Sequence, residues 1–127
     1  MKPTAPQQPL LSDAGLPAAA APGGLTLESF RKGPFTVVKM AGRLHAGAAV
    51  TAEAEILSTI VMAPRPLRLV LDLTEVTSVD FHGKSLLTKT RFTVQAGRGT
   101  LLVVAPDDSP VHRIPHLDVV STPVHLG

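Results

Sequence analysis

The segment LRLVLDL at residues 67–73 constrains the fold more than any other part of the chain. It is rich in Leu and Val with little polar interruption, which is typical of a strand covered on both faces, as the central strands of parallel sheets are. A polar turn around Asp80 follows, and the chain enters a helix after Gly83. A buried strand that leads through a short turn into a helix favours an α/β fold.

Four further segments have the composition of strands. Alternating LTLESF (25–30) and the apolar FTVVKMAG (35–42), separated by a turn of sequence RKGP, predict a β-hairpin whose second strand ends at Gly42. TLLVVAP (100–106) predicts a further buried strand, and residues 122–126 a short last one.

Helical spacing is found in two longer segments. Residues 47–62 place four side chains on one helical face, namely Val50, Ala54, Leu57 and Val61, and two prolines then stop the helix. Residues 83–96 carry a looser stripe of Leu86, Leu87, Thr90 and Val94. Ser109 as N-cap and Pro110 as first helical residue predict a third helix of about one turn, because Pro115 disfavours its continuation.

The order of these elements predicts an α/β domain over residues 24–127. Its mostly parallel central sheet has about five strands, with an N-terminal β-hairpin and helices packed on it. Residues 1–23 contain five prolines and the run PAAAAPGG, which predicts a disordered leader. The alanine run has the propensity for a helical turn, but Pro17 and Pro22 bracket it.

Composition excludes several function classes. Without cysteine there is no disulfide, thiolate zinc site or thiol nucleophile. A net charge of +2, with four Phe and no Trp or Tyr, gives no nucleic-acid signature. No apolar run has the roughly 18 residues of a membrane span, and no secretory signal is evident, so we expect a cytoplasmic protein. Abundant Ala, Gly, Pro and Val suits a high-GC bacterial genome.

Catalytic and metal-binding patterns are weak. The sequence has no G-x-S-x-G, no Gly-rich phosphate loop and no HExxH motif, so we expect neither an enzyme nor a bound cofactor. His112 and His116 have a spacing that suits a metal on a helix, but Pro115 lies between them and would break that helix. We therefore expect no metal site.

Three stretches resemble the STAS domain, the fold of bacterial anti-sigma factor antagonists. Residues 41–45 (AGRLH) stand where that family often has G-x-L-D, and residues 69–76 (LVLDLTEV) resemble its central strand and following turn. Residues 79–83 (VDFHG) stand where it has D-S-S-G or D-S-T-G. The resemblance covers residues 25–124 and supports the fold more strongly than the regulatory switch.

In that family the serine after the aspartate is phosphorylated by an anti-sigma factor that is itself a serine kinase, and the unphosphorylated protein binds this partner. The resemblance matches Asp80 to the aspartate and Gly83 to the glycine, but it places Phe81 on the acceptor serine and His45 on the earlier aspartate. Phe cannot carry a phosphate. The resemblance thus implies a regulatory protein-interaction module that binds an anti-sigma factor kinase or related signalling protein, without phosphorylation at Phe81.

The candidate partner-binding residues are His45, Asp80, Phe81, His82, Gly83 and Lys84. Phe81 would supply an apolar anchor. His82 and Lys84, beside a helix N-terminus, would hold an anion or an acidic partner side chain. The plainer alternative for Asp80 is that of a helix N-cap, and for the two cations that of ordinary surface residues.

Three hydroxyls near this corner are candidate alternative phospho-acceptors: Ser78, Ser85 and Thr88. The plainer alternative is that each is a capping or solvated hydroxyl. A second function also remains open, namely a small-ligand or nucleotide-binding domain with its crevice at the strand ends near Asp80. A homodimer is a further possibility.

Overall fold

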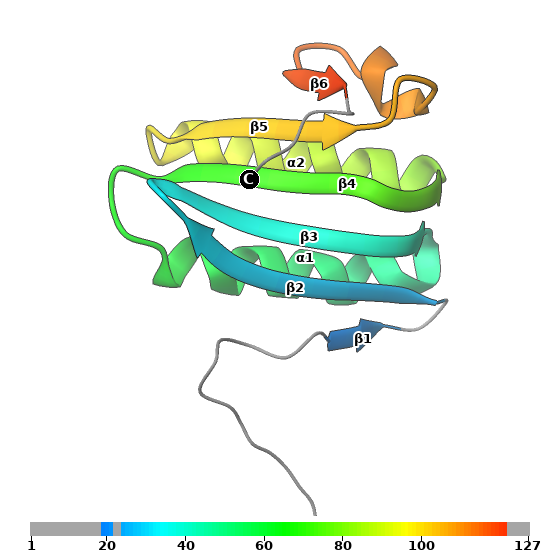
Figure 1. The fold of residues 1–127 in the computed structure, drawn as a ribbon, viewed down its shortest axis with the longest axis horizontal. Coiled ribbons are helices and arrows are strands. Elements are labelled where there is room, and N and C mark those ends of the chain that lie inside the picture. The colour runs from blue at the N-terminus through cyan, green and yellow to red at the C-terminus, as the bar shows by residue number, and fades with distance from the viewer. Residues whose placement is uncertain (1–18, 22–23, 122–127) are drawn as a thin grey trace, which may run out of the picture.

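The structure, a computed structural model, describes residues 19–21 and 24–121 (Figure 1). Within these residues six strands form one sheet in chain order: β1 (Ala19–Ala21), β2 (Leu25–Lys32), β3 (Phe35–Leu44), β4 (Arg68–Val79), β5 (Thr100–Ala105) and β6 (Val119–Ser121). The helices are α1 (Ala46–Met62), α2 (Phe81–Ala96) and the short 3-10 helix η1 (Pro110–Arg113).

The sheet is mixed, as predicted. Strands β1, β2 and β3 are successively antiparallel, whereas β3, β4, β5 and β6 are successively parallel. The parallel connections from β3 to β4 and from β4 to β5 run through α1 and α2, and the one from β5 to β6 contains η1, so the predicted hairpin, helices and parallel sheet are confirmed. Strand β4 lies between two parallel neighbours and is buried on both faces, because Leu69 and Leu71 belong to the main core and Val70 to a smaller apolar cluster on the other face.

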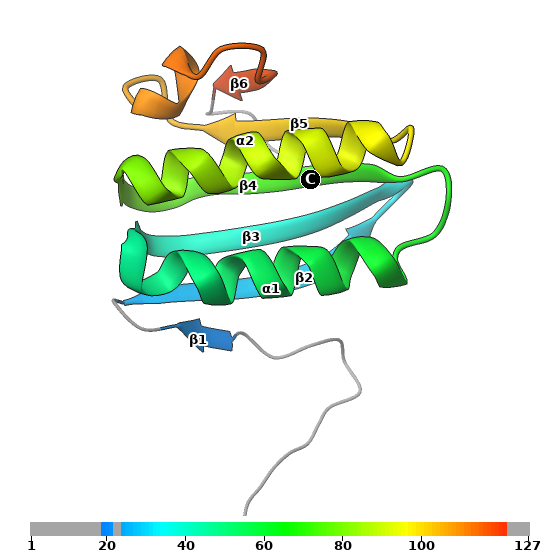
Figure 2. The ribbon, with the colours of Figure 1, turned by 180° about the vertical axis from the view of Figure 1, so that it is seen from behind.

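Both long helices cover the same face of the sheet, which Figure 2 shows from the helix side. Helix α1 packs against β2 and β3, and α2 against β4 and β5. The row Val38, Leu71 and Val103 lies in the main core on that face. A smaller cluster, with Val37 and Val70 paired across β3 and β4, lies on the opposite face.

Helix α2 meets the sheet as its sequence predicts. Leu86, Leu87, Thr90 and Val94 are all buried. Gly97 follows the last helical residue, and its backbone N–H bonds back to the final turn. The predicted short helix is also confirmed, because Ser109 accepts a hydrogen bond from the Val111 N–H at 3.3 Å and Pro110 begins η1.

Helix α1 packs through a different face from the one its sequence suggested. The side chains against the sheet are Ala48, Ala52, Ile56 and Ile60. The stripe of Val50, Ala54, Leu57 and Val61 is exposed instead, and Val50 and Val61 are 76% and 75% accessible. Two apolar faces coexist on this helix, and the small alanines of the buried one allow it to lie close to the sheet.

Two strand assignments differ from the prediction, and a third falls outside the described residues. Strand β3 does not end at Gly42 but continues to Leu44, because irregular pairing with β4 and a φ of +110° at Gly42 keep the strand in the sheet. The predicted disorder of the leader does not hold for β1, whose three residues pair with β2 through backbone groups that need no side-chain period. The strand predicted at 122–126 lies outside the described residues, and β6 precedes it.

Candidate functional site

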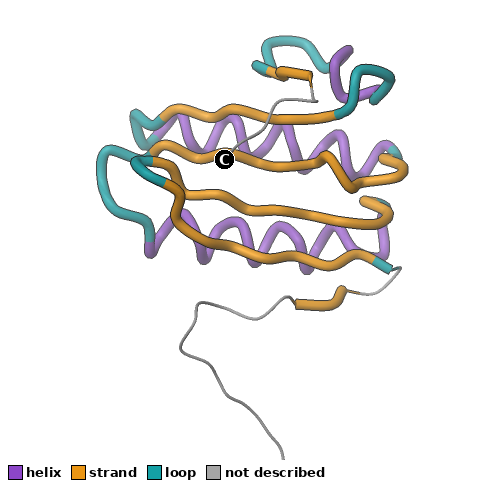
Figure 3. The backbone as a smooth tube through the Cα atoms, in the orientation of Figure 1, coloured by secondary structure: helices purple, strands orange, loops and turns teal. Residues whose placement is uncertain are grey.

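The candidate site is the corner where β3 and β4 end side by side. Leu44 and Val79 are paired across the two parallel strands, and each strand leads directly into a helix. The N-termini of α1 and α2 therefore meet at one edge of the sheet, at the same end of both helices (Figure 3). This edge collects the partial positive charge of two helix dipoles.

Asp80 caps both helices with one carboxylate. Its Oδ1 accepts the backbone N–H of Gly83 at 2.9 Å, in the first turn of α2. Its Oδ2 accepts the backbone N–H of Ala46 at 3.0 Å, at the start of α1. The Asp80 N–H in turn donates to the carbonyl of Leu44 at 3.2 Å. The predicted N-cap of α2 is confirmed, and the same side chain also joins the two helix ends.

These contacts set the ionisation of Asp80. Desolvation at the corner would raise the pKa of the carboxyl, but the hydrogen bonds from Gly83 and Ala46, with the nearby His45 and His82, outweigh it. The pKa of Asp80 is therefore lowered from its ordinary value. The carboxylate is held in its charged form, as expected of a group that accepts two backbone N–H bonds.

Gly83 allows α2 to approach the end of β3. A Cβ atom at this position would collide with the carbonyl oxygen of Leu44 and lie 2.8 Å from Cγ1 of Val79. Only a residue without a side chain fits here, so the glycine has a packing role whether or not a partner touches it.

His45 and Ser78 interact across the corner. The ring Nε2 of His45 lies 2.8 Å from the Ser78 hydroxyl oxygen. His45 occupies the N-cap position of α1 without making a side-chain capping bond, since Asp80 supplies that acceptor. Ser78 is half-buried, and its hydroxyl is already engaged by the His45 ring.

No protein-family model matches the chain, and no curated protein matches it. One solved structure of similar fold is an anti-sigma factor antagonist from Mycobacterium paratuberculosis, with 24% identity over 76% of this chain and 80% of that one and a TM-score of 0.63. Another is the anti-sigma factor antagonist SpoIIAA in its unphosphorylated form, with 16% identity over 78% of this chain and 89% of that one and a TM-score of 0.59. The chain has a STAS-like fold. A third similar structure, of a protein named Mglu, is 20% identical over 64% of this chain but only 20% of that one, with a TM-score of 0.55.

In this STAS-like domain the residue that follows Asp80 carries an exposed aromatic ring. Phe81 is the first residue of α2 and is 74% accessible. Its ring meets that of His82 edge-on, with centroids 5.7 Å apart and an interplanar angle of 78°. His82 and Lys84 are also exposed, so the corner presents an apolar ring beside two basic side chains.

A groove of about 490 Å³ runs beside α2, between that helix and η1. We call it the α2–η1 groove; it is lined by Phe81, Lys84, Ser85, Thr88, Lys89 and Phe92 of α2 and by Pro110, Arg113, Ile114 and Pro115 across from them. The other two candidate phospho-acceptors, Ser85 and Thr88, therefore lie in this groove rather than at the Asp80 carboxylate. Each is half-buried.

Sequence reasoning missed the second half of this surface. Phe92 is 59% accessible and lies on the same side of α2 as Phe81, with the intervening positions 85 and 88 at spacings of four, three and four. That spacing was readable in the sequence, but the stripe has two hydroxylated members and does not stand out as apolar. The wall made by Pro110, Ile114 and Pro115 comes from a distant segment and had no such signal.

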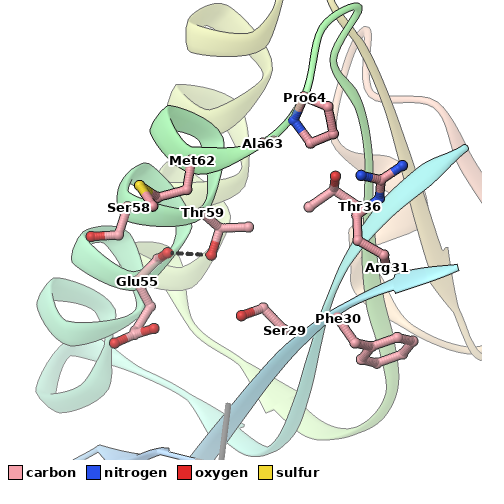
Figure 4. A pocket seen from close by; sticks show the side chains of 10 residues that line it. All are labelled: Ser29, Phe30, Arg31, Thr36, Glu55, Ser58, Thr59, Met62, Ala63 and Pro64. Carbon is pink, nitrogen blue, oxygen red and sulfur yellow. Dashed lines mark hydrogen bonds between the residues drawn. The ribbon is translucent and has the colours of Figure 1, made fainter. Parts of the chain in front are cut away.

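A second hollow with a mostly apolar lining lies away from the ligand crevice expected near Asp80. A cavity of about 340 Å³ lies at the opposite end of α1, between that helix and the β2–β3 hairpin (Figure 4). Ser29, Arg31 and Thr36 from the strands face Glu55 and Thr59 of α1. The Thr59 hydroxyl donates to the Glu55 carbonyl at 2.8 Å.

The described residues bear on metal binding and on membrane insertion. They contain no group of three or more His, Asp or Glu side chains arranged to hold a metal ion. Among the same residues, no helix is long and apolar enough to cross a membrane.

Proposed function

We propose that this chain is a regulatory protein-interaction module that binds an anti-sigma factor, or a related signalling protein, through the corner at Asp80. The observation that carries the proposal is the exposed Phe81 on the first turn of α2, next to a carboxylate that ties two helices together. A large apolar side chain on a rigid scaffold often contributes much of the binding free energy of a protein interface. The STAS-like fold, shared with two anti-sigma factor antagonists, supports this partner class.

The proposed interface consists of His45, Asp80, Phe81, His82, Gly83 and Lys84. Their roles differ. Asp80, His45 and Gly83 hold the backbone of the corner through the capping bonds, the bond to Ser78 and the close approach to Leu44. Phe81, His82 and Lys84 are exposed and would make the direct contacts. We therefore expect substitutions in the first group to act through stability and those in the second through affinity.

We infer that binding does not depend on phosphorylation of residue 81, because Phe81 has no hydroxyl. A phosphate would add about −1.5 to −2 charges at neutral pH and disrupt an apolar interface. Ser85 and Thr88 remain the candidate alternative acceptors, since both line the α2–η1 groove beside Phe81. Neither a catalytic role nor a cofactor is proposed, because both oxygens of Asp80 are already engaged by backbone N–H groups.

The test is affinity capture of tagged protein from its native lysate, with and without Mg-ATP, read by mass spectrometry. We expect an anti-sigma factor kinase in both conditions and no phosphopeptide from residues 77–90. Phe81→Ala should lower capture by roughly 30-fold or more, the equivalent of a 2 kcal/mol hot spot. Phe35→Ala is the matched control, since Phe35 is an exposed ring at the start of β3, at the other end of the sheet.

Equal capture by wild type and Phe81→Ala would contradict the proposed interface. Loss of the partner with Mg-ATP, together with phosphate on Ser85 or Thr88, would mean that a phosphorylation switch acts at a neighbouring hydroxyl. Capture of no anti-sigma factor under either condition would overturn the partner class.

A second candidate function is small-ligand binding, and the cavity in Figure 4 is the observation that favours it. Its volume of about 340 Å³ falls at the lower end of the range for small-molecule sites. A rise in melting temperature with a nucleotide or metabolite, kept in Phe81→Ala but lost when Ser58→Trp fills the cavity, would support this function. No shift across a broad panel would count against it.

A further inference from the structure

We propose that the α2–η1 groove binds an acidic, amphipathic helical segment of the partner protein. The proposal rests on the proposed function, because it names the chemistry of the partner segment that docks beside the same corner. It also extends the interface from the six corner residues along the whole outer side of α2.

The length and lining of the groove suit a helix. Phe81 and Phe92 are eleven residues apart on α2, which corresponds to about 16 Å or three helical turns. Both rings are largely exposed, at 74% and 59%. Ile114 and the prolines of the η1 segment form the facing apolar wall. An amphipathic helix of about three turns could bury its apolar side between these two walls.

The charges along the groove are all of one sign. Lys84, Lys89 and Arg113 line it, and none of the described residues that line it is acidic. Lys89 also pairs with Glu53 of α1, with 3.9 Å between Nζ and Oε1. Lys84 and Arg113 make no ion pair within the described part of the chain. Three basic side chains around an apolar channel are complementary to carboxylates flanking an apolar stripe.

The two walls are held in place before any partner arrives. Arg91 stacks its guanidinium over the Phe92 ring, 5.0 Å from the centroid, which favours one orientation of that ring. The η1 wall is anchored by the buried Val111 and by the His112 Nε2 contact to the Pro106 carbonyl at 2.9 Å. Because the groove is already formed, less conformational entropy is lost when the partner binds.

A nucleic acid is the competing polyanion, but it fits these observations less well. Its phosphates would meet the three basic side chains, yet the aliphatic and proline wall offers no flat aromatic surface for bases. Phe81 and Phe92 also lie too far apart to clamp one base, at about three turns of helix. An acidic helix satisfies the charges and covers both apolar walls together.

The test uses a fluorescein-labelled three-turn peptide with Leu and Phe on one face and Glu on the other, measured by fluorescence anisotropy with the full chain. A matched peptide carries Lys in place of Glu, and a single-stranded oligonucleotide of equal charge serves as the polyanion control. We expect only the acidic peptide to bind, and more weakly as salt rises. Lys84→Glu with Lys89→Glu, and separately Phe92→Ala, should each weaken binding by roughly 5- to 30-fold.

The control variants are Lys32→Glu and Phe35→Ala, which make the same kinds of change at exposed positions on β2 and β3, away from the groove. Equal binding of the acidic and basic peptides, equal binding of the oligonucleotide, or no loss in the groove variants would each overturn the proposal. Capture of the anti-sigma factor by the double lysine variant but not by Phe81→Ala would leave the proposed function standing and refute the groove. If no anti-sigma factor is captured at all, the peptide measurements still decide the groove.

Discussion

Replacing Gly83 by alanine should destabilise the domain, although the same change usually stabilises a helix. An added Cβ would meet the Leu44 carbonyl oxygen, Cγ1 of Val79 at 2.8 Å and Cγ of Leu44 at 3.0 Å. The first obstacle is backbone rather than the end of a flexible side chain. The upper part of the usual overpacking range, about 2–3 kcal/mol, should therefore apply. Alanine is the better helix former by about 1 kcal/mol, which leaves a net loss of about 1–2 kcal/mol.

Thermal and urea denaturation would measure this loss. For a domain of this size the melting temperature should fall by roughly 5–15 °C. Gly97→Ala is the matched control: its φ of −90° suits alanine, and its nearest contacts for a Cβ are 3.7 and 3.8 Å. That variant should be neutral or stabilised by up to about 1 kcal/mol. An equal change in melting temperature for Gly83→Ala and Gly97→Ala would contradict the close approach of α2 to the end of β3.

Three further perturbations test the corner and the core. Asp80→Asn should be less stable than wild type at neutral pH. Because the folded-state pKa of Asp80 is lowered, the stabilisation that the carboxylate provides is complete above the ordinary Asp pKa and is lost as the pH falls through the folded-state pKa. The denaturation curves of the two proteins should therefore converge in acid. Ile56→Ala should cost about 2–4 kcal/mol in urea denaturation, whereas Leu57→Ala on the exposed stripe should cost less than about 1 kcal/mol; similar costs would contradict the orientation of α1. His45→Ala should cost about 1 kcal/mol by removing the partner of Ser78, and the double variant with Ser78→Ala should cost no more if that bond is the whole effect.

The central part of the fold was predictable because its sequence signals are local. The apolar run at 67–73 indicates a strand buried on both faces, and Leu71 on the helix side and Val70 on the other side are both buried. On α2 the helical spacing of apolar residues predicts a single buried stripe, and that stripe is the one buried in the structure. The N-cap role of Asp80 was also readable, since a carboxylate three residues before a helical N–H is a local arrangement.

Helix α1 shows where such reasoning fails. Its sequence offers two apolar stripes, and spacing alone ranks the one with Val50 and Val61 above the one with Ala48 and Ala52. The sheet selects the other, because small side chains let the helix backbone lie close while Ile56 and Ile60 fill the remaining space. Which stripe is buried depends on the shape of the surface beneath the helix, and that shape is not a local property.

The sequence by itself determined the order of elements from β2 to η1, the central strand buried on both faces and the first cap made by Asp80. Only the tertiary structure decided that the same carboxylate also binds Ala46, 34 residues away, and that Phe92 faces Ile114 across a basic groove. The physical reason is the range of the interactions. Periodicity and capping act within one or two helical turns. The N-terminus of α1 and the η1 wall of the groove are instead brought to the corner by the parallel pairing of β3, β4 and β5.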